Sequence, residues 1–193
     1  MKSFVYFLVV VFLAFCATTG LAATNRTINV KATIASVSGG LNVAISKVVG
    51  DVFTPDSAIN FGTLTFDSTY RIFRPSDGRY YAVDIGVMDN TGTAWTLTHT
   101  RTSFKKDDTN NLDNNVNVTF MKQTSDTTGT QLRRVSFANS NNVSYTKSQL
   151  AGGWLRIYYG IASGKGDASG VTPIGLDKPA GTYAGTVTIT LTP

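Results

Sequence analysis

Apolar and polar residues alternate along several segments of the chain, and turn-forming residues separate these segments. An alternation with a period of two places one set of side chains on each face of a β-strand. Segments with this pattern are residues 27–37, 41–48, 58–66, 70–73, 79–88, 93–100, 116–123, 152–162 and 181–192. No long segment has the period of a helix. The pattern therefore predicts an all-β fold, an antiparallel two-sheet immunoglobulin-like sandwich of about 8–10 strands.

The first residues have a different pattern. Lys2 is followed by an uninterrupted apolar run, residues 4–15, and then by small residues. This order is typical of a secretory signal peptide, and the run is shorter than the roughly 20 apolar residues that a membrane-spanning helix needs. We predict that residues 1–22 are a cleaved signal peptide. Residues 23–193 then form a single secreted domain that does not span the membrane.

Composition agrees with this prediction. Every one of the 12 acidic residues is Asp, and Thr, Gly and Asn are abundant, as expected for strands joined by turns. The only cysteine, Cys16, lies in the predicted signal peptide, so the secreted domain has no disulfide. The formal net charge is +5, but the basic residues are scattered, which argues against a nucleic-acid-binding protein.

Few residues are suited to catalysis. His99 is the only histidine, and it shares a strand face with Trp95 and Leu97. That position favours a buried structural histidine over a member of a Ser–His–Asp triad. One histidine and no cysteine in the secreted domain also exclude the usual zinc sites. We therefore predict a protein that is not an enzyme and that needs no cofactor.

The polar stretch of residues 101–115 holds the one candidate metal site. Asp107, Asp108 and Asp113, with neighbouring asparagines, offer oxygen atoms of the kind that calcium binds. The stretch lacks the alternating ligands and the glycine of an EF-hand loop. A solvated surface loop is therefore the main prediction, and a metal site is the weaker alternative.

Both ends of the secreted domain are predicted strands, and they carry characteristic phrases. The first reads "INVKATI", an early element reads "INFGTL", and the last reads "AGTYAGTVTITLT". In these phrases the sequence resembles secreted bacterial pilin-type β-sandwiches, in particular the major subunits of alternate-class chaperone–usher fimbriae. It is similar, more loosely, to spore-coat-U-like proteins. The absence of cysteine fits the alternate class better than the classical pilins.

The resemblance implies an incomplete sandwich whose groove is filled by the N-terminal strand of a neighbouring subunit, a form of β-augmentation. The donated side chains would be Ile28, Val30, Ala32 and Ile34. Tyr183, Val187, Ile189 and Leu191 of the final strand would line part of the acceptor groove. The resemblance also implies self-association of identical subunits, a periplasmic chaperone, an outer-membrane usher, and export through the periplasm to a fimbrium or coat on the cell surface.

A different class of function stays open. In a self-contained binding module the first strand would complete its own sandwich, and the protein would bind a carbohydrate or a protein ligand. The tyrosine-rich phrases "RYYAV" (residues 79–83) and "RIYYG" (residues 156–160) could stack against sugar rings or pack within the sheets. An exposed aromatic row would favour the binding module.

Overall fold

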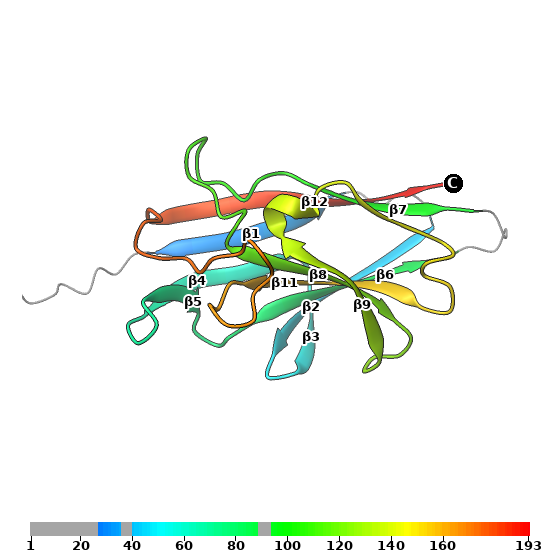
Figure 1. Ribbon diagram of the computed structural model, residues 1–193, viewed down its shortest axis with the longest axis horizontal. Helices are drawn as coiled ribbons and strands as arrows, with labels where there is room; N and C mark the ends of the chain where they lie inside the picture. The colour runs from blue at the N-terminus through cyan, green and yellow to red at the C-terminus, as the bar shows by residue number, and fades with distance from the viewer. Residues whose placement is uncertain (1–26, 36–39, 89–93) are drawn as a thin grey trace, which may run out of the picture.

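The computed structural model describes residues 27–35, 40–88 and 94–193, so the predicted signal peptide lies outside the described residues. Two six-stranded sheets pack face to face (Figure 1). Sheet A has the strand order β10-β7-β12-β1-β4-β5, and sheet B has the order β3-β2-β6-β11-β8-β9. In the described part of the chain, no helix has the length and apolarity needed to cross a bilayer.

The strands of sheet A, in that order, are β10 (Val143–Thr146), β7 (Thr96–Arg101), β12 (Gly181–Thr192), β1 (Ile28–Ala35), β4 (Ile59–Asp67) and β5 (Ile72–Pro75). Those of sheet B are β3 (Val52–Asp56), β2 (Leu41–Val49), β6 (Tyr80–Val87), β11 (Trp154–Ile161), β8 (Val116–Gln123) and β9 (Gly129–Ser136). A short 3₁₀ turn, η1 (Phe137–Ser140), follows β9.

The predicted all-β fold with two packed sheets is confirmed, with two differences in detail. More strands are present than expected, because the sequence pattern missed β3, β9 and β10. Every residue of β3 is exposed, and so are most residues of β9, so neither strand shows an apolar alternation. The second difference is that β1 pairs with β12 in parallel. All other pairs among the described strands are antiparallel.

The core between the sheets is rich in aromatic side chains. Its largest fully buried members are Tyr81, Tyr159, Tyr183, Phe61, Phe73, Phe104, Phe120 and Phe137. Aromatic side chains bury a large area each and pair edge to face, as Phe61 and Tyr81 do with ring centroids 5.5 Å apart. Packing of this kind stabilises the domain without a disulfide.

The polar stretch after β7 is a loop, as predicted, but it is anchored in the core. Phe104 and Leu112 are fully buried, and their backbones are joined by a hydrogen bond from the Leu112 amide to the Phe104 carbonyl (2.8 Å). Asp113 accepts a hydrogen bond from the Phe104 amide (2.7 Å) and forms an ion pair with Arg101 (2.5 Å). The sequence pattern missed these anchors because each apolar residue stands alone among polar neighbours.

His99 is buried on β7 with both ring nitrogens in hydrogen bonds. Nδ1 lies 2.7 Å from the Ser140 carbonyl oxygen and therefore donates, so Nε2 accepts from the Tyr159 hydroxyl at 2.9 Å. Burial lowers the pKa of His99 to about 4. The imidazole is thus neutral at pH 7, and its neighbours are a carbonyl and a phenol rather than a nucleophile and a carboxylate.

We expect this histidine to make stability depend on pH between about 6.5 and 4. In that window the unfolded chain binds a proton at His99 and the folded chain does not, so the free energy of unfolding falls by about 3 kcal/mol as the pH falls. Urea unfolding at pH 7 and pH 4 measures this loss. The His99→Gln variant should show a clearly smaller loss, and an equal loss in both proteins would contradict the expectation.

Candidate functional site: the groove that holds the first strand

β1 lies in the middle of sheet A, between β12 and β4 (Figure 1). Its residues pair in parallel with β12 from Ile28 opposite Gly181 to Ala35 opposite Thr188. On its other side β1 pairs with β4, from Ile28 opposite Leu64 to Ala32 opposite Ile59. Without β1, sheet A would split into a three-stranded piece, β10-β7-β12, and a two-stranded piece, β4-β5. The facing edges of β12 and β4 would then lose their hydrogen-bonding partners.

The four side chains predicted to be donated lie on the face of β1 that points into this groove. Ile28, Val30 and Ala32 are fully buried, and Ile34 is half-buried. Lys31 and Thr33, which alternate with them, are exposed. β1 therefore places an apolar row into the core between the sheets and leaves its polar face in water.

The residues predicted to form the acceptor groove lie along the same face of β12. Tyr183 is opposite Val30, and Val187 is opposite Ile34, and both acceptor side chains are fully buried. Ile189 and Leu191 lie beyond the last residue that pairs with β1. They are opposite His99 and Leu97 of β7 instead. The structure thus brings β1 next to the first half of the predicted acceptor row, and the second half packs on β7.

Gly185 is a part of the groove that the sequence reasoning did not single out. It lies opposite Ala32, and it faces the segment that leads from β7 into the polar loop. A Cβ atom at this position would be 3.0 Å from the Ser103 carbonyl oxygen and 3.4 Å from the Phe104 Cα. The small residue lets that segment pack closely over β12, where the Lys105 amide donates to the Ala184 carbonyl at 3.1 Å.

β4 forms the second wall of the groove, which the sequence reasoning also left out. Opposite the step from Val30 to Lys31, the register of β4 shifts by one residue at Phe61. Gly62 there has a φ of 67°, a conformation that side chains other than glycine rarely adopt. The Tyr81 hydroxyl of sheet B donates to the Asn60 carbonyl at 2.7 Å. The glycine in the sequence "INFG" (residues 59–62) is the feature from which this bulge could have been predicted.

The three candidate metal ligands have separate partners. Asp107 accepts hydrogen bonds from the amides of Thr109 and Asn110, Asp108 pairs with Lys105, and Asp113 pairs with Arg101 as described above. Among the residues that the structure describes, no group of three or more His, Cys, Asp or Glu side chains is arranged to hold a metal ion. The carboxylates instead fix the shape of the loop.

Comparisons of the chain with models of protein families, with curated proteins and with solved structures give no match. Function is therefore inferred from the sequence phrases quoted above and from the geometry of the groove.

Proposed function

We propose that the protein is an exported structural subunit of a bacterial surface fibre or coat, in which β1 of one copy fills the groove of the next. The observation that carries the proposal is the place of β1. It is the first described strand, yet it lies between the interior edges of β12 and β4 and contributes three fully buried side chains. An element of this kind can complete a neighbouring copy as well as its own.

The connection to β1 permits such an exchange. Only residues 36–40 join β1, in sheet A, to β2, in sheet B. Five extended residues span about 17 Å. β1 can therefore fill the groove of another copy only where that groove ends within this distance of Leu41, so the exchange requires two copies in close contact.

The contacts in the groove also explain why the exchange would need control. An open groove would expose the edges of β12 and β4 and the apolar floor beneath them, which invites unspecific pairing. A periplasmic chaperone would cover these edges during export, and an outer-membrane usher would be the place where β1 of the next subunit replaces it. Both partners belong to the proposal.

A second candidate function is a self-contained binding module. The observation that favours it is that β1 lies in the groove of its own chain. Intrachain and interchain filling would use the same contacts, because only the connection of residues 36–40 differs between them.

The size of the native particle distinguishes the two candidates. We expect residues 23–193 to form multimers that are seen by light scattering and that persist as a ladder on an unheated denaturing gel, since each subunit would be held by a complete strand. Heating the same sample should return a single band. A stable monomer with the same mobility before and after heating would favour the binding module.

A further inference from the structure

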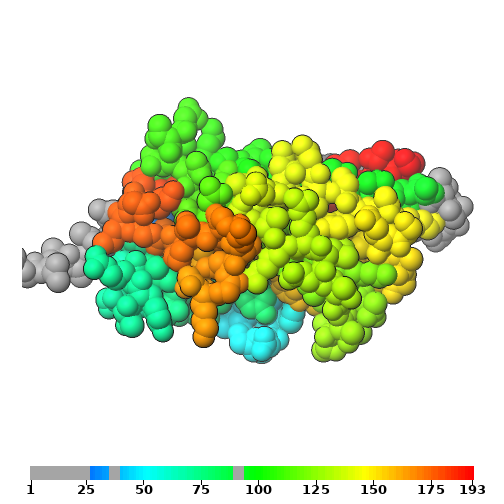
Figure 2. Space-filling model, in the orientation of Figure 1, coloured from blue at the N-terminus to red at the C-terminus, as the bar shows by residue number. Residues whose placement is uncertain are grey.

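The outer face of sheet B carries a row of aromatic and charged side chains that the groove does not use. A hollow of about 220 Å³ lies on this face at the start of the connection that follows β11. Its lining includes Tyr80, Thr119, Arg134, Tyr158, Lys165 and Asp167. We call it the outer hollow. In Figure 2 the orange connection after β11 projects beside the cyan hairpin of β2 and β3 at this edge of the molecule.

The two tyrosines of the outer hollow contact each other, and Tyr158 also has Arg156 beside it on β11. Their ring centroids are 5.9 Å apart, and the Arg156 guanidinium lies 6.0 Å from the centre of the Tyr158 ring. Arg156 is itself fixed by two hydrogen bonds to Asp84, of 2.7 and 2.8 Å. Both rings remain partly exposed. They form a preorganised aromatic wall that a ligand can contact at little cost in side-chain entropy.

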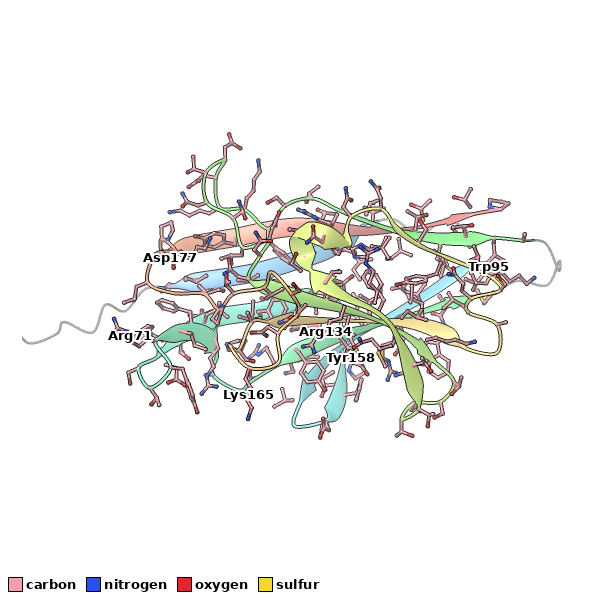
Figure 3. All side chains as sticks on the ribbon, viewed as in Figure 1. Arg71, Trp95, Arg134, Tyr158, Lys165 and Asp177 are labelled. Carbon is pink, nitrogen blue, oxygen red and sulfur yellow. The ribbon has the colours of Figure 1, made fainter. Side chains whose placement is uncertain are left out.

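The cations of the outer hollow are available to a ligand. Arg134 and Lys165 are exposed, and neither side chain takes part in an ion pair within the described part of the chain. The nearby Asp167 carboxylate accepts hydrogen bonds from Asn117 at 2.7 Å and from the Gly164 amide at 2.7 Å. Figure 3 shows Arg134 next to Tyr158, with Lys165 on the same lower side of the molecule.

We propose that the outer hollow binds a carboxylated pyranose, a sugar acid at the end or within a glycan. The C–H face of the ring would pack on Tyr158 and Tyr80, because aromatic faces attract such partly positive C–H groups. The carboxylate would accept two hydrogen bonds from the planar guanidinium of Arg134, and Lys165 would supply a second positive charge. The volume suits one sugar ring.

The neighbouring surface sets the orientation of this ligand. The next hollow along sheet B, of about 400 Å³, is lined by three carboxylates, those of Asp51, Asp84 and Asp126, with Arg156 already paired to one of them. A sugar acid would be repelled there and attracted at Arg134. The carboxylate of the bound ring therefore points away from β2 and β3 and toward β9.

Saturation-transfer NMR, which detects the signals of a small ligand that binds to the protein, tests the proposal. The measurement can be made on residues 23–193 whether they form a monomer or a multimer. The probes are methyl β-D-glucuronide and the methyl α-glycoside of N-acetylneuraminic acid, with methyl β-D-glucoside as the neutral control. At least one acid should bind with a dissociation constant of about 1 mM, and the glucoside at least tenfold more weakly. Acetate at equal concentration should not displace the bound acid.

Two matched variants locate the site. Arg134→Ala should weaken binding of the sugar acid about tenfold, and Tyr158→Ala should weaken it similarly. Arg133→Ala removes the same charge from the neighbouring position, which is opposite the core residue Phe120 rather than opposite Thr119, and it should leave binding unchanged. No binding of either acid, full displacement by acetate, or equal loss in Arg133→Ala and Arg134→Ala would overturn the proposal. None of these results depends on whether β1 is exchanged between copies.

Discussion

A chain that lacks residues 23–37 should fail to form a stable sandwich, and a peptide of residues 28–37 added in trans should restore it. The deletion removes β1, whose Ile28 and Val30 are fully buried. Each such side chain contributes about 1.5–3 kcal/mol on burial. The lost pairing with β12 and β4 adds to this. The total is comparable to the whole free energy of unfolding of a small domain, about 5–15 kcal/mol.

Circular dichroism and thermal melting of the truncated chain, with and without the peptide, measure this effect. A peptide with Val30→Asp is the matched control, since it would place an unpaired carboxylate in the core, and it should not rescue folding. A peptide with Thr33→Asp changes an exposed position and should rescue almost as well as the native sequence. A truncated chain that folds and melts like the full domain would contradict the structural role assigned to β1.

The second large effect is expected at the ion pair between Asp84 and Arg156 on the outer face of sheet B. The Arg156 side chain is only 5% exposed, and that of Asp84 is 25% exposed. Burial lowers the pKa of Arg156, but the hydrogen bonds to Asp84 and Tyr158 raise it more, so the guanidinium stays charged. Asp84 also accepts from the Trp154 indole nitrogen at 2.7 Å. One carboxylate thus accepts from two donors, the buried Arg156 guanidinium and the half-buried Trp154 indole.

Asp84→Ala should therefore lower the free energy of unfolding by about 3–5 kcal/mol, because it leaves a buried charge without a partner. The double variant Asp84→Leu, Arg156→Met should regain more than half of that loss, since no charge remains to be compensated. Asp77→Ala is the matched control. Its pair with Arg79 is more exposed, with side chains 32% and 28% exposed, and should cost less than about 1 kcal/mol. Urea unfolding of the four proteins decides, and equal losses in Asp84→Ala and Asp77→Ala would be the contradicting result.

The strands that the sequence predicts correctly are those with one face in the core. β12 is the clearest case, since Tyr183, Val187 and Ile189 are buried and threonines alternate with them. β3 could not be found in the same way because it is an edge strand exposed along its whole length. Its pairing with β2 depends on the turn between them, where Gly50 and Asp51 both have a positive φ.

The order and direction of strands in a sheet are harder to read from a sequence. The alternation of Ile28, Val30 and Ala32 predicts a buried face but not its neighbours. It is the pairing on both sides that makes β1 an interior strand. The parallel match of β1 with β12 joins two segments from opposite ends of the described chain, and no local pattern carries that information. The groove between β12 and β4 therefore follows from the order of the strands in sheet A, which the local sequence pattern does not predict.

The outer hollow, too, could be predicted only in part from the sequence. The tyrosine-rich phrases indicate aromatic residues on two adjacent strands, and Tyr80 and Tyr158 do meet on the outer face. Their neighbours Tyr81 and Tyr159 are buried in the core instead. The sequence did not predict that Arg134 and Lys165 would lie beside the exposed pair, because they come from β9 and from the connection after β11.

A disulfide between copies tests most directly whether β1 of one subunit fills the groove of another. Thr33 of β1 is opposite Thr186 of β12 on the outer face of sheet A, and residues 23–193 contain no cysteine. Thr33→Cys and Thr186→Cys single variants of residues 23–193 would be unfolded, mixed, refolded and oxidised. We predict a disulfide-linked dimer of the two variants on a non-reducing gel, and a ladder of linked multimers for the double variant. A mixture without linked dimers, together with a double variant that forms only an intrachain disulfide, would show that β1 stays in its own chain.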